Sequence, residues 1–285
     1  MPHPVAFLDV FAERPLAGNG LAVVDGADEL SDGVMLAFAR ETRLSETTFV
    51  QSTDRDGADY RNRIWTPEEE LPFAGHPSLG TAVAVARWRG EPEAAYVQET
   101  GAGLQPIEVR DEGESWHASM LQREPEFGAV LDPAAALAAA GLEEGDGEAE
   151  LPPQMVSTGI AHAIVPVAAA ESLARARPDW EAVDALLAPH DGVVLYLAWC
   201  EPREGRGRAR SFSRTAALGE DPATGSAVGP LCAYLARRAD CEAITVAQGE
   251  EMGRPSRLEA RMEAGRVRVS GRVLPLIAGE VDLPA

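Results

Sequence analysis

Two short motifs in this chain combine a titratable side chain with a proline, a glycine and a hydroxyl group. HPSLGTAV at 76–83 and DPATGSAV at 221–228 both read [His/Asp]-Pro-x-x-Gly-[Ser/Thr]-Ala-Val, and an apolar stretch follows each. A helix that begins at such a motif has unpaired backbone N–H groups, its dipole attracts an anion, and glycine lets a ligand approach the backbone. The pattern predicts two facing helix starts that bind a small carboxylate or enolate.

His76 and Asp221 hold equivalent places in the two motifs. Such a pair could donate a proton on one side of a substrate and orient it on the other. The same signals also occur in ordinary helix caps and turns, so a purely structural role for each motif stays open.

Glu46 is a third candidate, within LSETTFVQ at 44–51, a segment rich in β-forming residues. On a strand, Leu44 and Glu46 face the same side. A carboxyl group that shares a face with apolar residues loses hydration and its pKa rises, as a general base near neutral pH requires. The alternative is an edge or a register break that leaves Glu46 in water.

The elements that must position these residues repeat along the chain. A similar strand precedes each motif, RIWT at 63–66 and RSFS at 210–213, and GNGLAVV and GIAHAIV begin further upstream at Gly18 and Gly159. The motifs lie 145 residues apart and the upstream strands 141, so the register nearly holds. We therefore predict a duplicated unit of about 140 residues, with strands wrapped on one central helix.

The central helices are expected at 77–88 and 226–238, because a helix that is apolar on nearly all sides belongs in a core. Capping signals predict shorter helices after Ser31, at 132–141 and at 178–188. The acidic stretch 143–153 and the arginine-rich stretch 203–210 are expected to be solvated loops. Strands are expected at 5–11, 18–24, 44–51, 58–66, 95–100 and 155–167, and again near the C-terminus.

Composition excludes several classes of function. The 285 residues carry a formal net charge of −21, which argues against nucleic acid and anionic membrane surfaces as partners. The sequence contains no lysine, so Schiff-base chemistry, pyridoxal-phosphate enzymes and P-loop nucleotide binding are excluded.

The cysteines and the N-terminus indicate a cytoplasmic protein. Cys200, Cys232 and Cys241 lack the spacing of a metal or redox motif, so reduced thiols are expected. MPHPVAFLDVF has neither the basic nor the long apolar region of a secretion signal, and no stretch is long enough to be a membrane span.

Five motifs together resemble the PhzF-like family of phenazine biosynthesis, which has the diaminopimelate-epimerase fold. They follow the family order along the chain: DVFAERPLAGNGLAVV (9–24), LSETTFV (44–50), FAGHPSLGTA (73–82), STGIAHAIVPV (157–167) and EDPATGSAVGPL (220–231). The resemblance implies an α+β fold of two pseudo-symmetric domains, expected at 1–125 and 126–285. Each would be a curled, barrel-like mixed sheet around a central apolar helix, with the active site between the domains.

The resemblance further implies a homodimeric isomerase that needs no cofactor or metal and acts on a small carboxylate, such as trans-2,3-dihydro-3-hydroxyanthranilate. By this analogy Glu46 is the acid/base, and His76, Asp221 and Ser226 assist proton transfer. The expected substrate-binding residues come from the same motifs: Asn19, Gly75, Thr224 and Gly225.

Two departures from relatives bear on these expectations. The family usually has Gly-Asn-Pro where this chain has GNG at 18–20, which concerns the rigidity of that loop. Related epimerases use two opposed thiols, whereas neither motif here contains cysteine, so a single carboxyl base favours a proton shift over stereoinversion. A thiol-independent amino-acid epimerase and a non-catalytic small-molecule binding protein remain the alternatives.

Overall fold

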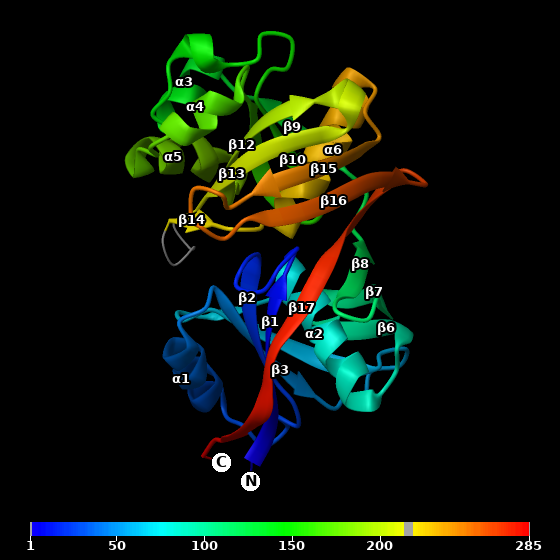
Figure 1. Ribbon diagram of the computed structural model, residues 1–285. Coiled ribbons are helices and arrows are strands. Elements are labelled where there is room, and N and C mark those ends of the chain that lie inside the picture. The colour runs from blue at the N-terminus through cyan, green and yellow to red at the C-terminus, as the bar shows by residue number, and fades with distance from the viewer. Residues whose placement is uncertain (1, 214–218, 285) are drawn as a thin grey trace. The chain divides into compact units, whose positions relative to one another are not determined.

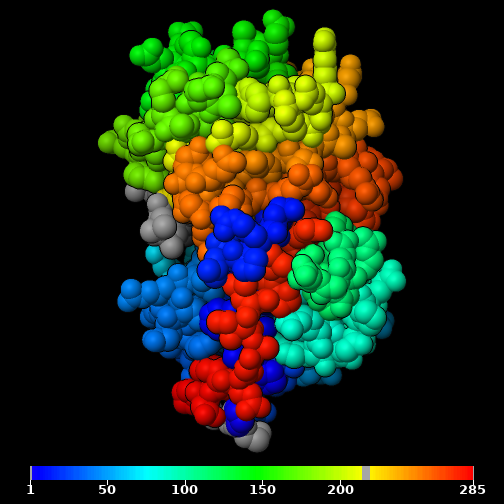
Figure 2. Space-filling model, viewed as in Figure 1, coloured from blue at the N-terminus to red at the C-terminus, as the bar shows by residue number. Residues whose placement is uncertain are grey.

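The computed structural model describes residues 2–213 and 219–284, and the packing of the chain divides it into two compact units. The first unit is Met1–Met120 together with Ser270–Ala285, and the second is Leu121–Val269. The domains predicted from the sequence meet at residues 125 and 126, whereas packing groups the last sixteen residues with the first unit. The reason is strand pairing, because the C-terminal strand runs antiparallel along the N-terminal strand from Pro2 to Val10 (Figure 1, Figure 2).

The first unit is a closed ring of strands (Figure 1). The order around the ring is β1–β2–β3–β4–β6–β7–β8–β17 and back to β1, in which β2–β3 and β4–β6 are parallel. The strands are β1 (Pro2–Val10), β2 (Asn19–Val24), β3 (Glu46–Gln51), β4 (Tyr60–Trp65), β6 (Glu93–Thr100), β7 (Gly103–Asp111), β8 (Trp116–Leu121), β17 (Arg266–Asp282) and the short β5 (Glu70–Leu71), which pairs with β4.

Helix α2 (Gly75–Arg89) fills the interior of this ring, and every residue from Gly75 to Ala86 is buried. The prediction of an all-round apolar core helix is therefore confirmed. Helix α1 (Asp32–Thr42) packs on the outside, against β3 and β4, and its N-cap is Ser31, as expected.

The second unit repeats the plan. Its strands pair in the order β9–β10–β11–β12–β13–β15–β16, with β11–β12 and β13–β15 parallel. The strands are β9 (Glu126–Val130), β10 (Gln154–Ser157), β11 (Ala161–Pro166), β12 (Val194–Glu201), β13 (Arg206–Phe212), β15 (Ala243–Gln248), β16 (Ser256–Glu263) and the short β14 (Glu220–Asp221) on β13.

Helix α6 (Gly225–Ala239) is the buried core helix of the second unit. Three smaller helices pack on the other face of its sheet, in a cluster with Leu195 and Leu197 of β12. The smaller elements are α3 (Pro133–Ala139), α4 (Ala170–Arg175), α5 (Trp180–Leu187) and the 3-10 turns η1 (Glu144–Asp146), η2 (Ala188–His190) and η3 (Pro202–Glu204). No helix among the described residues is long and apolar enough to cross a membrane.

The duplication predicted from the sequence is visible in the pairing pattern. From β1 to β7 and from β10 to β16, successive pairs are antiparallel, parallel, antiparallel, parallel and antiparallel. Helices α2 and α6 each have 15 residues and begin at Gly75 and Gly225, and a two-residue strand precedes each of them.

The predicted equivalence of His76 and Asp221 is wrong. Because the helices begin at Gly75 and Gly225, ELPFAGHP aligns with EDPATGSA, so His76 corresponds to Ser226 and Asp221 to Leu71. The two prolines misled the motif alignment. Pro77 is the third residue of α2, where the backbone N–H would have no partner within the helix, so proline is tolerated there. Pro222 instead lies before the start of α6.

The prediction of an arginine-rich loop at 203–210 is also wrong, because β13 covers most of it. Gly207 and Ala209 alternate with the arginines and face the interior, so the stretch has the period-two pattern of a strand. Arg206 and Arg208 pair with glutamates on the outer side, and Arg210 is buried.

The turn before β2 depends on Gly18, which has a φ of +67°. A Cβ atom there would lie 2.4 Å from the Val10 carbonyl oxygen and 2.8 Å from the Ala12 Cβ. We expect Gly18→Ala to lower the free energy of unfolding by about 3 kcal/mol, because backbone strain and overlap with the main chain add. Urea denaturation measures the loss.

Gly57→Ala is the matched control, because Gly57 has a φ of +80° but no atom within 4 Å of the place that a Cβ atom would take. It should lose about 1 kcal/mol from backbone strain alone. Equal losses in the two variants would show that the close approach of Gly18 to Val10 carries no stability.

Candidate active site

In the first unit, Glu46 and His76 lie side by side. Glu46 begins β3 beside Leu21 of β2, and His76 is the second residue of α2. Glu46 Oε2 is 3.3 Å from His76 Nε2, and the Glu46 side chain is 16% exposed. The carboxyl group is therefore largely withdrawn from water, in contrast to the alternative in which it is solvated.

Asn19 determines which nitrogen of His76 carries the hydrogen. The Asn19 side-chain amide nitrogen lies 3.2 Å from Nδ1, and since an amide nitrogen can only donate, Nδ1 accepts. Nε2 then carries the ring hydrogen on the side of Glu46. Burial lowers the pKa of His76 to about 3, so the imidazole is neutral at pH 7.

The start of α2 has no side-chain cap. Its N-cap residue is Ala74, in extended conformation, and Gly75 is the first helical residue. An alanine cap leaves backbone N–H groups of the first turn without the usual hydroxyl or carboxylate acceptor. This arrangement suits an anionic group of a ligand beside Glu46 and His76.

In the second unit, Asp221, Thr224, Gly225 and Ser226 lie together at the start of α6. Thr224 is the N-cap residue, but its hydroxyl donates to Asp221 Oδ2 at 2.5 Å instead of capping the helix. Gly225 is buried and Ser226 is partly exposed. A carboxylate, a hydroxyl group and a helix start are thus placed next to one another.

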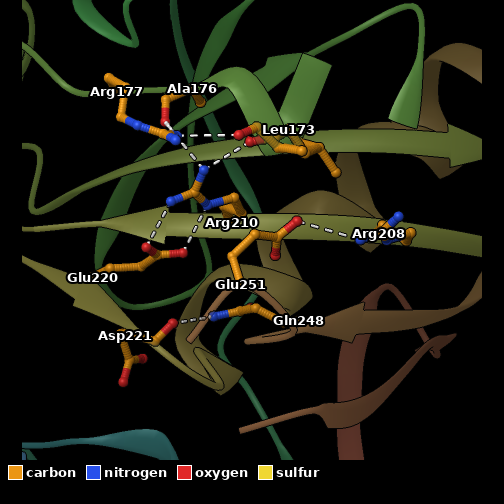
Figure 3. A network of polar contacts seen from close by, with 10 residues as sticks. Leu173, Ala176, Arg177, Arg208, Arg210, Glu220, Asp221, Gln248 and Glu251 are labelled. Carbon is orange, nitrogen blue, oxygen red and sulfur yellow. Dashed lines mark hydrogen bonds and ion pairs between the residues drawn. The ribbon is translucent and has the colours of Figure 1, made fainter. Parts of the chain in front are cut away.

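An arginine–glutamate pair holds the segment that leads into α6 (Figure 3). Arg210 of β13 donates to both oxygens of Glu220 in β14, at 2.8 Å each, and to the carbonyl oxygens of Leu173 and Ala176. The side chains are 8% and 14% exposed. Glu220 points to Arg210, and the Asp221 side chain points away from it.

The first unit contains the same pair in the same place. Arg63 of β4 donates to both oxygens of Glu70 in β5, at 2.7 and 2.5 Å, and also to Asp32 of α1. We call these two pairs the arginine clips. Sequence reasoning missed them, although the spacing Glu-x-Pro-x-x-Gly, found at both 70–75 and 220–225, was a readable signal.

The two units differ in their reactive groups. Strand register places Val194 of β12 where β3 has Glu46, because each faces the corresponding residue of the preceding parallel strand, His162 and Leu21. The carboxyl group of Glu46 therefore has no counterpart in the repeat. Among the described residues, no cluster of three or more His, Cys, Asp or Glu side chains is arranged to hold a metal ion.

Two of the three cysteine thiols are not activated as nucleophiles. Cys232 is buried within α6, and burial raises the pKa of its thiol to about 12. Burial also raises the pKa of Cys200 to about 12. Both groups are protonated at neutral pH and are poor nucleophiles.

His162 is a second buried histidine that the sequence did not single out. It lies in β11, at the place that Leu21 occupies in the first unit, and the backbone of Ser226 at the start of α6 contacts it. Burial lowers the pKa of His162 to about 4, so its ring is neutral at pH 7.

His162 should make the stability depend on pH. Below the ordinary value of about 6.5 the unfolded chain takes up a proton, whereas the folded chain stays neutral down to about pH 4. Stability is therefore lost as the pH falls through this interval, by about 2 kcal/mol between pH 7 and pH 5. Urea denaturation at both values should show this loss reduced in His162→Leu, which installs the residue of the first unit. An unchanged loss in the variant would contradict the assignment.

The Arg210–Glu220 clip should matter more for stability than the less buried Arg63–Glu70 clip. Arg210→Met leaves the Glu220 carboxylate buried without its partner, and we expect a loss of about 3 kcal/mol or more. Arg63→Met should lose only about 1 kcal/mol, because Glu70 is 34% exposed and water can solvate it. Urea denaturation of the two matched variants gives both values, and a smaller loss for Arg210→Met would contradict the burial argument.

Comparison with known proteins places the chain in a family. The family model described as phenazine biosynthesis-like protein matches residues 8–279. The trans-2,3-dihydro-3-hydroxyanthranilate isomerase of Pseudomonas aeruginosa is 38% identical over 273 residues, which cover 94% of this chain and 93% of that protein.

Solved structures agree with this result. A PhzF-family phenazine biosynthesis protein from Bacillus anthracis superposes with a TM-score of 0.86 at 27% identity, over 99% of each chain. A hydroxyproline epimerase from Agrobacterium vitis shares the fold, with a TM-score of 0.66 at 15% identity over 98% of this chain and 91% of its own. The family and the α+β fold expected from the sequence are confirmed, and the chain belongs to the phenazine biosynthesis-like (PhzF) family.

Proposed function

We propose that this chain is a cofactor-independent isomerase that moves a proton between two carbons of a small cyclic carboxylate, with Glu46 as the acid/base. The observation that carries the proposal is the largely buried Glu46 carboxyl group, 3.3 Å from a neutral His76 and beside an uncapped helix start. A buried carboxyl base next to an anion-binding helix start can both remove a proton and stabilise the charge that results.

In the proposed reaction, Glu46 removes a proton from a carbon next to an electron-withdrawing group. The electron pair of the broken C–H bond moves into the conjugated system, and the backbone N–H groups at Gly75 help to bind the carboxylate or enolate. The protonated Glu46 then returns the proton to another carbon of the same molecule. The double bond shifts, and no atom is gained or lost.

We propose that His76 and Asn19 orient the Glu46 carboxyl group and the substrate. His76 has its ring hydrogen on Nε2, which suits a donor to a carboxylate or to a developing oxyanion. Asp221, Ser226 and Gly225 are the further proposed site residues, the first two through their side chains and Gly225 through its backbone.

The relatives named as isomerases suggest the substrate class. The P. aeruginosa protein is a trans-2,3-dihydro-3-hydroxyanthranilate isomerase, and proteins of that name from two further Pseudomonas species are 36–37% identical to this chain. We propose a cyclic, amino-substituted dienoic acid of this kind as the substrate. A homodimer in the cytoplasm is the proposed setting, and light scattering of the purified protein tests the dimer.

We expect Glu46→Gln to lower turnover by roughly 10²- to 10⁴-fold, because the amide cannot accept the proton. The assay is proton NMR of trans-2,3-dihydro-3-hydroxyanthranilate in D₂O, which follows both the double-bond shift and the incorporation of solvent deuterium. Glu68→Gln, an exposed change in the loop before β5, is the control and should keep full activity.

Full turnover by Glu46→Gln would remove Glu46 as the base. Deuterium exchange with loss of optical rotation and an unshifted double bond would instead assign an epimerase. Thermal stabilisation by the carboxylate without any exchange would assign a binding protein. His76→Ala and Asp221→Ala should each slow turnover by roughly 10²- to 10⁴-fold, and an effect confined to KM would limit both residues to binding.

A further inference from the structure

Gln248, the last residue of β15, connects the core of the second unit to the segment that carries Asp221. Its side chain is 1% exposed. Nε2 donates to the Asp221 carbonyl oxygen at 2.7 Å, as Figure 3 shows, and to Thr224 Oγ1 at 3.0 Å. Oε1 accepts from the Tyr196 hydroxyl at 2.9 Å and from the Thr224 backbone N–H at 3.4 Å. One buried amide thus holds both ends of the segment before α6.

The direction of each hydrogen bond in this group is determined by chemistry. An amide oxygen accepts only, so the Tyr196 hydroxyl must donate, and burial raises the pKa of Tyr196 well above its ordinary value and keeps that hydrogen in place. The amide nitrogen of Gln248 donates only, so Thr224 Oγ1 accepts from it.

The Thr224 hydroxyl therefore has its single hydrogen available for Asp221. Oγ1 donates this hydrogen to Asp221 Oδ2 at 2.5 Å. The bonds form a directed chain, Tyr196 to Gln248 to Thr224 to Asp221, that ends on a carboxylate oxygen. Donation from a hydroxyl group that cannot turn elsewhere fixes the orientation of that carboxylate.

The first unit provides an internal comparison. Gln98 of β6 has the same position along the chain as Gln248, since β6 and β15 begin equally far after their core helices, and it too is fully buried. Its register differs, because Gln98 faces Tyr60, three residues before Arg63, whereas Gln248 faces Ala209, directly before Arg210. In that unit the places of Asp221 and Thr224 are taken by Leu71 and Ala74, and Gln98 Oε1 accepts from Asn62 instead. The series of hydrogen bonds that ends on Asp221 thus occurs in the unit that has a carboxylate at this place.

We propose that Thr224 and Gln248, with Tyr196 behind them, are positioning residues that hold the Asp221 carboxylate in its working orientation. This inference rests on the proposed function in taking Asp221 as a residue that acts on the substrate. It also revises the sequence expectation for Thr224, whose hydroxyl serves Asp221 and not the substrate.

The first test measures the hydrogen bond without any substrate. Thr224→Val, Asp221→Leu and the double variant form a cycle of urea denaturation experiments. Leucine, which the first unit has at this place, cannot accept the hydrogen bond, whereas the amide oxygen of an asparagine still could. We expect the losses to be non-additive, with a coupling of roughly fivefold or more in the unfolding equilibrium constant. The cycle repeated with Thr224→Ser in place of Thr224→Val should show almost no coupling, because serine keeps the hydroxyl group. Additive losses of stability in the valine cycle would contradict a stabilising hydrogen bond from Thr224 to Asp221.

The second test measures turnover in the same D₂O assay. Thr224→Val should lower kcat by roughly 10- to 100-fold with little change in KM, and Thr224→Ser should restore it. In the Asp221→Asn background, Thr224→Val should lower kcat no further, because its effect passes through Asp221. A full additional loss in that background would overturn the positioning role.

The two proposals fail in different ways. If Asp221→Asn keeps full turnover, the role of Asp221 in the proposed function is wrong, whatever the unfolding cycle shows. If Asp221→Asn is slow but Thr224→Val is as fast as the unsubstituted chain, the proposed function stands and the positioning role is wrong. Tyr196→Phe, which removes one donor to Gln248, should lower kcat less than Thr224→Val does. A larger loss of kcat would contradict the proposed order of the hydrogen bonds, in which Thr224 is the direct partner of Asp221.

Discussion

The burial of an apolar helix inside each unit is the constraint on which the rest of the structure depends. Helix α2 is buried from Gly75 to Ala86, and α6 has the same length and the same kind of environment. A helix buried on all sides can expose its polar backbone groups only at its ends. The first turn of each helix is therefore where a ligand can meet unpaired N–H groups, and the arginine clips fix the strand that leads into that turn.

The two units share one arrangement of strands around a core helix, but they differ in the polar residues at equivalent places. His76 and Ser226 occupy one equivalent place, Leu71 and Asp221 another, and Glu46 and Val194 a third. Both units have the same three structural features: the arginine clip, the glycine at the start of the core helix and the buried glutamine of the following strand. Glu46, the proposed base, has no carboxyl counterpart in the second unit, which is consistent with the proposed proton shift within one molecule.

Desolvation determines how the polar groups of both units behave. It keeps His76 and His162 neutral at pH 7, and it keeps the thiol of Cys232 protonated. A buried polar group that lacks a hydrogen-bond partner costs free energy of folding. Gln248 makes four hydrogen bonds, and three of them are to Asp221 or Thr224 in the segment before α6.

The family, the duplication and the two core helices could be predicted from the amino-acid sequence. The order of motifs and an apolar pattern on all sides of a helix are visible in the sequence itself, without knowledge of which residues contact one another in the fold. The sequence also brought Glu46 and His76 forward as candidates. The alignment of His76 with Ser226 required the folded chain, since the helix start and not the proline sets the register. The folded chain was also needed to show that 206–212 is a strand, that Arg210 meets Glu220, and that Gln248 reaches Thr224. These contacts join residues 10 to 24 positions apart through strand pairing and burial, which no local pattern records.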